Sequence, residues 1–312
     1  MIQNIFSREL GIGENLLIRK NSITGTGPDT GKRVSIVTGI HGDELEGQYV
    51  CAVLAGMLER ESDCLSGTVD IYPALNPLGI DSMTRGIPTF DLDMNRIFPG
   101  SADGGIFETA AWEIVQDITG SDVCVDIHSS NTYLTEIPQV RINIDTAERL
   151  VPLASLLNMD LIWVHNAATV LESTLAYSLN SRGTDTLVVE MGVGLRITRG
   201  YCDQLISGLI SLLHGLSMWT GPVPEVCRPA VARDREVAFL NAEVSGIFAA
   251  EAAHWTELKK GSLIGRVYDP ADGRILQEVT APETGRLFTL REYPVATEGA
   301  LLGRILKGEH NA

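Results

Sequence analysis

The chain has 312 residues, of which 40 are acidic and 24 are basic, so its formal net charge is −16. A chain this acidic lacks the basic surface that binds phosphate backbones, and we expect no nucleic acid partner. Hydrophobic residues make up 44% of the chain, which is enough for a sizeable core and argues against wholesale disorder. The length favours about two domains.

The compartment is predicted from the N-terminus, the hydropathy and the cysteines. Residues 1–9 lack the basic-then-apolar layout of a signal peptide, and no apolar run of about 18 residues occurs, so we expect no membrane partner. The five cysteines are scattered and show no CxxC spacing, which disfavours a disulfide framework. We therefore expect a cytoplasmic protein in which Cys51 and Cys124 are small core residues.

Predicted strands and helices alternate in the first part of the chain. A β-branched run at residues 34–40 predicts a buried strand, and apolar residues at helical spacing follow at 44–61. Residues 76–105 are rich in Gly, Pro and Asp and predict a long polar loop. Further strands are expected at 68–75, 123–128, 139–144, 161–165 and 186–190, and further helices at 107–119, 146–157, 170–180 and 202–219. This alternation predicts an α/β fold with a mixed or largely parallel sheet.

Residues 223–312 have a different pattern, with short strand-like runs between Gly, Pro and Asp turns. They hold 13 acidic and 11 basic residues, so most of the negative charge lies before them. This shift and the Gly/Pro-rich segment 221–224 predict a boundary between domains 1–222 and 223–312. The strand-like runs are at 236–240, 246–249, 263–268, 285–290 and 301–305. A small all-β domain is expected here.

The strongest local signal lies at residues 39–47, GIHGDELEG, where a buried strand meets a helix. Sites in open α/β sheets form at the carboxyl ends of strands. His41 and Glu44 are three residues apart and could converge on one metal ion, because zinc accepts imidazole nitrogens and carboxylate oxygens. The alternative is a surface histidine beside Asp43, which would cap the helix.

A second strand end, at residues 123–131, supplies a third candidate ligand. Asp126 and His128 lie on the same side of the strand, and both are costly to bury without partners. His128 could complete the ligand set of one catalytic zinc, with Asp126 orienting the ligands from outside. The alternative is an ordinary strand-end histidine that is satisfied by hydrogen bonds. Two such strand ends in one chain favour the metal site.

A third strand end carries a lone carboxylate. The buried run 186–189 leads into Glu190, and two glycines follow within four residues. A carboxylate at this position suits a general base. The alternative is a strand-end glutamate that faces water.

The predicted loop at 76–105 contains Arg85 and Arg96, although residues 1–222 hold only 13 basic residues. An arginine can stabilise a developing oxyanion, or bind a carboxylate through two hydrogen bonds. The alternative is that both arginines stabilise the loop through salt bridges to Asp91 and Asp93.

Four motifs together resemble the succinylglutamate desuccinylase/aspartoacylase family, a branch of the zinc carboxypeptidase superfamily. They are HGDE at 41–44, DLDMNR at 91–96, DIH at 126–128 and EMG at 190–192, in the family's order and approximate spacing. The resemblance covers roughly residues 30–220. It implies a carboxypeptidase-like mixed sheet flanked by helices, with one zinc on His41, Glu44 and His128.

The resemblance also implies roles for other residues. Glu190 matches the family's general base, and Arg85 is similar to the arginine that holds the oxyanion. Asn95 and Arg96 match the pair that holds a substrate carboxylate. Arg141 is expected as a further specificity residue, with a solvated strand arginine as the alternative.

The C-terminal part resembles a biotinyl/lipoyl-type β-sandwich at the turns 242–249, 259–265 and 280–286. Carrier domains of that type present a lysine at a hairpin tip, whereas this turn holds Glu283 and Thr284, which argues against a carrier role. We expect this part to supply no zinc ligand. It would either cover the mouth of the cleft or form the surface of a homo-oligomer.

These expectations combine into one function. The resemblance implies zinc-dependent hydrolysis of the amide bond of a small N-acyl amino acid or related acylated amine, with Glu190 as the base. A zinc carboxypeptidase acting on peptides is a second enzyme interpretation. A non-catalytic binding module with a structural zinc is the third, although structural sites usually have four protein ligands and only three good ones are found here.

Overall fold

The computed structural model describes residues 1–88, 90, 92–166 and 172–308. The strands of the first part are β1 (Ile2–Glu9), β2 (Asn15–Thr24), β3 (Arg33–Thr38), β4 (Thr68–Tyr72), β5 (Val123–Ser129), β6 (Leu134–Asn143), β7 (Leu161–His165) and β8 (Asp185–Gly192). Its helices are α1 (Glu46–Arg60), α2 (Pro77–Ser82), α3 (Ile106–Ile118), α4 (Ala147–Ala154), α5 (Leu175–Asn180) and α6 (Arg199–Gly215). Strands and helices alternate, as the sequence predicted.

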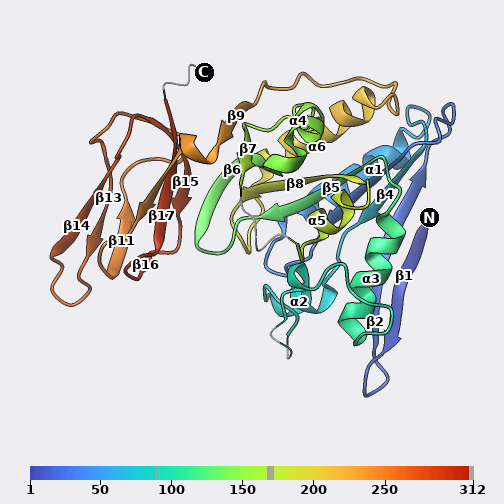
Figure 1. Cartoon of the computed structure of the whole chain (residues 1–312), viewed down its shortest axis with the longest axis horizontal. Coiled ribbons are helices and arrows are strands. Elements are labelled where there is room, and N and C mark those ends of the chain that lie inside the picture. Colours follow the sequence, from blue (N-terminus) through green and yellow to red (C-terminus); the bar gives the residue numbers. More distant parts are fainter. Residues whose placement is uncertain (89, 91, 167–171, 309–312) are drawn as a thin grey trace.

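One large mixed sheet runs through the molecule (Figure 1). The neighbours β4, β3, β5 and β8 are parallel, whereas β1, β2 and β6 join them in antiparallel fashion. The carboxyl ends of β3, β5 and β8 therefore lie at the same edge of the sheet. The mixed α/β fold class is confirmed.

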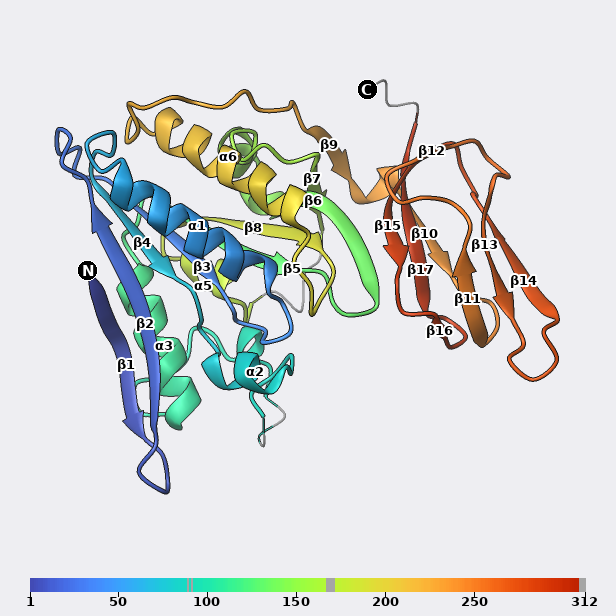
Figure 2. The same ribbon diagram turned by 180° about the vertical axis from the view of Figure 1, so that it is seen from behind.

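Helices cover the two faces of this sheet unequally. On one face, α1 and α6 pack over the strands (Figure 2), and Leu150 of α4 shares a core with their Val50 and Leu205. On the other face, α3 packs against β1 and α5 against β8, and Ile114 and Leu175 of these helices lie in one core. They leave alternate side chains of β8, β6 and β7 to form the floor of a cavity, which is described below.

The C-terminal part consists of two antiparallel sheets packed face to face. Its strands are β9 (Ala230–Arg233), β10 (Val237–Asn241), β11 (Gly246–Ala250), β12 (Glu257–Leu258), β13 (Leu263–Tyr268), β14 (Ile275–Thr280), β15 (Gly285–Arg291), β16 (Val295–Ala296) and β17 (Leu301–Lys307). Strands β11, β13, β14 and β16 form a separate sheet, and β10, β12, β15 and β17 belong to the large one. Phe248, Ile264 and Ile305 lie in the core between them.

Strand β6 connects the two parts of the chain. Its first half pairs with β15, where Thr289 lies opposite Glu136, and its second half pairs with β7. Strand β9, which follows the predicted boundary, pairs with β7. A second core contains Ile137, Trp163 and Phe288 from both parts. The boundary near residue 222 stays a prediction, but backbone pairing crosses it at two places.

Two features of the first part differ from the sequence predictions. The prediction of a loop at 76–105 is wrong at α2 and at a 3₁₀ turn (Met94–Arg96). Helix α2 forms because Pro77 occupies its first turn and the Asn76 side chain accepts a hydrogen bond from the Gly79 backbone at 2.9 Å. The hairpin β1–β2 was not predicted, because most side chains of β1 are exposed and lack apolar alternation.

The other predicted elements lie within a few residues of the observed ones, although β6 begins at Leu134 and not at 139, and β9, β12, β14 and β16 were not predicted. Helix α5 begins at Leu175, and positions 170 and 171 of the predicted helix lie outside the described residues. Cys51 and Cys124 are buried, as predicted. Among the helices of the described ranges, none is both long and apolar enough to cross a membrane.

The core shared by the two parts can be tested with Phe288, which is fully buried against the Trp163 ring. Replacing Phe288 by Ala leaves a cavity, and we expect the free energy of unfolding to fall by ~3–5 kcal/mol in urea denaturation. Ile275→Ala, on the exposed side of β14, should cost less than about 1 kcal/mol. Equal losses for the two variants would contradict a core at this position.

Candidate metal centre and cavity

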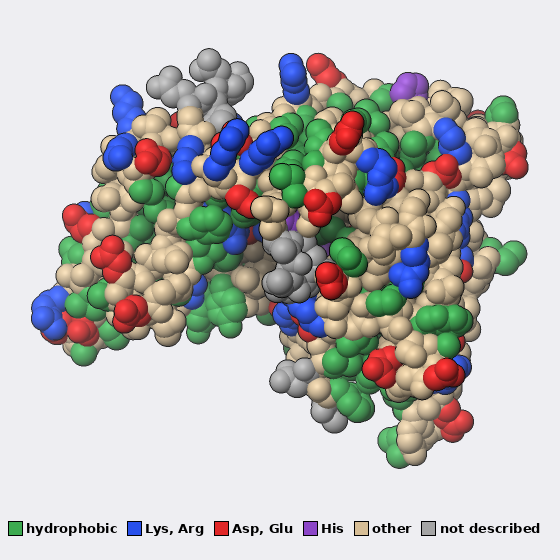
Figure 3. Space-filling model, in the orientation of Figure 1, with side chains coloured by type: hydrophobic (Ala, Val, Ile, Leu, Met, Phe, Trp, Pro, Cys, Tyr) green, Lys and Arg blue, Asp and Glu red, His purple; other side chains and the backbone are tan. Residues whose placement is uncertain are grey.

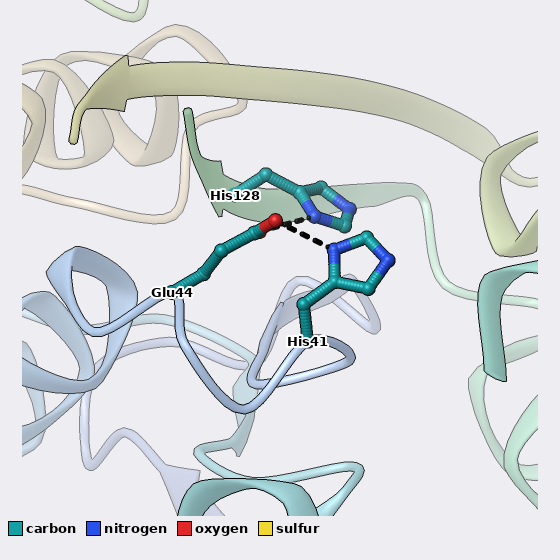
Figure 4. A group of neighbouring side chains, drawn as sticks. All are labelled: His41, Glu44 and His128. Atoms are coloured by element: carbon teal, nitrogen blue, oxygen red, sulfur yellow. Dashed lines mark hydrogen bonds and ion pairs between the residues drawn. The ribbon is translucent and has the colours of Figure 1, made fainter. Parts of the chain in front are cut away.

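Three titratable side chains meet at the carboxyl edge of the parallel strands. His41 follows β3, Glu44 precedes α1, and His128 lies near the end of β5. Strands β3 and β5 pair in register, with Thr38 opposite Ile127, which brings both histidines to the same place (Figure 4). The three residues are buried, with 3%, 3% and 4% of their surface exposed. The structure therefore brings together the three predicted metal ligands.

The Glu44 carboxylate lies between the two imidazoles. Its Oε1 is 2.7 Å from Nδ1 of His41, and its Oε2 is 2.8 Å from Nδ1 of His128. Nitrogen and oxygen donors from the three side chains all lie within 4.8 Å of one another. A buried set of two imidazoles and one carboxylate is the donor chemistry that a zinc ion accepts. The residues present therefore fit a metal ion.

Each imidazole contacts a second carboxylate through its other nitrogen. Nε2 of His41 lies 3.1 Å from Oδ1 of Asp93, and Nε2 of His128 lies 3.3 Å from Oδ2 of Asp126. Such carboxylates fix the tautomer and the orientation of a ligating histidine. Asp126 lies where the sequence placed it. From the sequence, Asp93 was predicted only as a salt-bridge partner of the loop arginines. Its position two residues before Asn95, within the DLDMNR motif, could have indicated a place near the metal site.

The protonation states follow from these contacts. Burial would raise the pKa of Glu44, but the charge of His128 and the hydrogen bonds from both histidines lower it to about 2. Burial would lower the pKa of His128, but Asp126 and Glu44 outweigh it and the pKa is raised well above the usual value. A metal ion bound here would compete with the proton that the raised pKa favours on His128.

A cavity of about 1080 Å³ extends from this cluster along the uncovered face of the sheet. Figure 3 shows a hollow between the C-terminal part and the rest of the molecule. Its far wall includes Phe239 of β10 and Arg304 of β17. Its floor is formed by side chains of three neighbouring strands: Thr186, Val188 and Glu190 of β8, Arg141 and Asn143 of β6, and Trp163 and His165 of β7.

Glu190 lies beside the metal cluster. It is the register partner of His128 on neighbouring parallel strands, so the two side chains lie on the same face of the sheet. Its Oε1 is 3.4 Å from Nη1 of Arg141, which also binds Glu136. Burial raises the pKa of Glu190 against the opposing charges of Arg141 and His128. The structure thus brings Arg141, which could have been a solvated strand residue, into contact with Glu190.

The loop arginines reach the same cavity in different ways. Arg85 places Nη1 3.0 Å from Oε1 of Glu44 and Nε 3.5 Å from Oδ2 of Asp93. Arg96 is exposed and donates a hydrogen bond to the backbone oxygen of Asn95 at 2.8 Å. The Asn95 side chain accepts a hydrogen bond from the backbone of Leu175 at 3.0 Å, which ties the loop to α5.

These contacts bear on the alternative in which the arginines only stabilise the loop. Arg85 forms the predicted salt bridge to Asp93, but it also contacts Glu44 of the metal cluster. Asp91, the other predicted partner, lies outside the described residues. Glu136, Trp163 and Arg304 are among the cavity residues that were not predicted from the sequence. Glu136 carried no clear signal, because it lies before the predicted strand 139–144 and its odd spacing from Arg141 would place the two on opposite faces of a regular strand.

Fold and site together define a class of protein. A mixed sheet flanked by helices, with a buried His–Glu–His cluster at the carboxyl ends of its parallel strands, is a carboxypeptidase-like α/β fold with a candidate metal centre. The chain belongs to the succinylglutamate desuccinylase/aspartoacylase family, because the model of that family's catalytic domain matches residues 30–216.

Relatives support the family and the fold. The chain is 24% identical over 282 residues to the N-alpha-acetyl-L-2,4-diaminobutyric acid deacetylase of Halomonas elongata. The matched region covers 85% of this chain and 79% of that protein. The product-bound ectoine utilization protein EutE (DoeB) of Ruegeria pomeroyi has a TM-score of 0.82 at 20% identity, covering 97% of this chain and 93% of its own. A succinylglutamate desuccinylase/aspartoacylase of Rhodobacter sphaeroides also has a TM-score of 0.82, at 21% identity, covering 99% and 96%.

The ligand assignment can be tested by replacing His128 with Ala. Removing one nitrogen donor should cost the chain its metal on dialysis, because two ligands hold an ion much less tightly than three. Metal per chain is measured by plasma mass spectrometry, and circular dichroism checks the fold. His165→Ala, which changes another histidine of the same cavity, should retain the metal. A full equivalent of metal in His128→Ala would show that His128 is not a ligand.

Proposed function

We propose that this chain is a cytoplasmic, zinc-dependent hydrolase that cleaves the amide bond of a small N-acyl amino acid or related acylated amine. The observation that carries the proposal is the position of Glu190, which lies directly opposite His128 and faces the same cavity as the His–Glu–His cluster. Family membership and the deacetylase among the relatives support the reaction class. The five unpaired cysteines suit a reducing compartment.

His41, Glu44 and His128 would hold the zinc ion. Among the described residues they are the only group of this kind, and a set of three protein ligands is typical of catalytic rather than structural zinc. When bound, the ion supplies Lewis-acid chemistry, which makes water acidic enough to lose a proton near neutral pH and polarises a carbonyl group.

Glu190 acts as general base and then as general acid. Its carboxylate accepts a proton from the attacking water and returns it to the nitrogen of the leaving amine. A pKa raised by burial suits both steps, because it lies nearer to the working pH than that of an ordinary carboxylate. Arg141 holds Oε1 of this carboxylate at 3.4 Å and so orients it.

The two loop arginines bind charge on the substrate. Arg85 lies against Glu44 and can donate hydrogen bonds to the oxyanion that develops on the acyl carbon. Arg96 is exposed at the cavity, and its guanidinium suits a substrate carboxylate, with Asn95 beside it. These roles select acylated amino acids over neutral amides.

Hydrolysis of a panel of substrates tests the proposal. The panel contains N-acetyl and N-succinyl amino acids, acylated diamines and short peptides, with liberated amine measured before and after treatment with a chelator. We expect chelator-sensitive release of amine from the acylated amino acids or diamines. Release from peptides alone would favour a carboxypeptidase, and bound zinc without any hydrolysis would favour a binding module.

Glu190→Gln keeps the size of the side chain and removes the basic carboxylate. We expect kcat to fall by at least ~10²-fold, in line with the usual contribution of a general base. Zinc content should stay unchanged, because Glu190 is not among the residues that would hold the ion. Near-normal turnover in a zinc-loaded Glu190→Gln protein would refute this role.

Arg96→Ala should separate charged from neutral substrates. Losing a charge-assisted hydrogen bond should weaken the reaction of substrates with a free carboxylate by ~1.5–3 kcal/mol. The corresponding amides or esters should react almost as before, as measured by kcat/KM. Arg274→Ala is the control, because Arg274 pairs with Asp272 at 2.6 Å and does not line the cavity. An equal loss for both substrate types would assign Arg96 a structural role.

A further inference from the structure

A carboxylate with two arginine partners lies in the wall of the cavity. Glu136 of β6 is 1% exposed, and both of its oxygens are bound. Oε2 accepts a hydrogen bond from Nη2 of Arg141 at 2.5 Å, and Oε1 accepts one from Nη1 of Arg304 at 2.6 Å. Gln139 also donates to Oε2, at 2.6 Å. Arg304 lies on β17, the last strand of the C-terminal part.

These contacts form a continuous series of ion pairs across the cavity. It runs from Glu190 through Arg141 and Glu136 to Arg304, with distances of 3.4, 2.5 and 2.6 Å. Trp163 fixes both arginines from the side, because their guanidinium carbons lie 5.6 and 5.4 Å from its ring centre. Arg304 of the C-terminal part is therefore linked to Glu190, next to the metal cluster, by two intervening side chains, Glu136 and Arg141.

The charges explain why two arginines are needed. A buried carboxylate requires compensation, and Glu136 with a single partner would draw that partner toward itself. Burial alone would raise the pKa of Glu136, but the charges of Arg141 and Arg304 outweigh it and keep the carboxylate ionised. With Arg304 on the other oxygen, Arg141 can place Nη2 on Glu136 while Nη1 remains near Glu190.

We propose that Arg304 is a positioning residue of the active site, which acts through Glu136 to hold Arg141 beside Glu190. This role rests on the proposed function, in which Glu190 transfers the proton. This role differs from the expectation that the C-terminal part only covers the mouth of the cleft. Here a side chain of β17 would set the position of the group that transfers the proton.

Arg286 provides a matched control within the same sheet. Its side chain is 15% exposed, as is that of Arg304. It pairs with Glu257 at 2.7 Å and lies over the ring of Trp255, so it makes the same kinds of contact as Arg304. It does not line the cavity. A structural contribution from a half-buried C-terminal arginine that lies over a tryptophan ring should therefore appear in both variants, although Glu257 is more exposed than Glu136.

The experiment compares Arg304→Met, Arg304→Lys, Glu136→Gln and the Arg304→Met/Glu136→Gln double variant with Arg286→Met, all loaded with zinc. We expect Arg304→Met to lower kcat by about tenfold or more with little change in KM, because a displaced Arg141 disturbs Glu190. Arg304→Lys should recover part of this loss, since it keeps the charge. The double variant should lose no more than the worse single variant, because both residues act through one contact.

Several results would overturn the proposal. They are an unchanged kcat in Arg304→Met, an equal loss in Arg286→Met, or independent, additive losses in the double variant. If Arg304→Met does not fold, Arg304→Lys carries the test: a zinc-loaded Lys variant with unchanged kcat contradicts the role, and a lowered kcat supports it.

A readout without turnover separates this proposal from the proposed function. If the wild type hydrolyses no member of the panel, the proposed function fails, and the position of Arg141 is measured by nitrogen-15 NMR instead. The side-chain N–H signal of Arg141 is identified by its absence in Arg141→Lys. It should shift in Arg304→Met and not in Arg286→Met. An unshifted signal in Arg304→Met would show that Arg304 does not hold Arg141.

Discussion

The structure around the candidate metal centre depends on one buried carboxylate between two imidazoles. Glu44 could not be buried without positive or metal partners, because an unpaired charge in the interior costs several kcal/mol. The two histidines compensate it, and Asp93 and Asp126 in turn orient the histidines. Strands β3 and β5 must therefore stay in register, because a shift of one residue would turn His128 away from Glu44.

The same sheet explains where a substrate can bind. Helices α1 and α6 cover one face, whereas α3 and α5 cover only part of the other, so polar side chains of β8, β6 and β7 line a cavity instead of a helix interface. Because β6 pairs with β15 as well as with β8, the C-terminal part is held next to this cavity. Backbone pairing thus brings Arg304 close to residues more than 100 positions earlier in the chain.

Charged side chains of both signs line the cavity. The metal cluster and Glu190 lie at one place on the floor, Arg96 is exposed on one side, and Arg141 and Arg304 are held by Glu136 on the other. Four arginines line the cavity, namely Arg85, Arg96, Arg141 and Arg304, but six acidic side chains line it as well, so the cavity is not positive as a whole. Under the proposed function the arginines would differ in use, because Arg85, Arg141 and Arg304 pair with carboxylates, whereas Arg96 is exposed and donates to a backbone oxygen.

The sequence by itself determined the alternation of strands and helices and the three strand ends that carry His41, His128 and Glu190. These are local patterns, since a buried strand and the polar residue that ends it are neighbours in the chain. Only the tertiary structure decided that Arg141 contacts Glu190, that Asp93 orients His41, and that β17 contributes Arg304. Arg141 and Glu190 are 49 positions apart, and His41 and Asp93 are 52 apart. Arg304 is 168 positions from its partner Glu136. No local periodicity of the sequence encodes pairings over such separations.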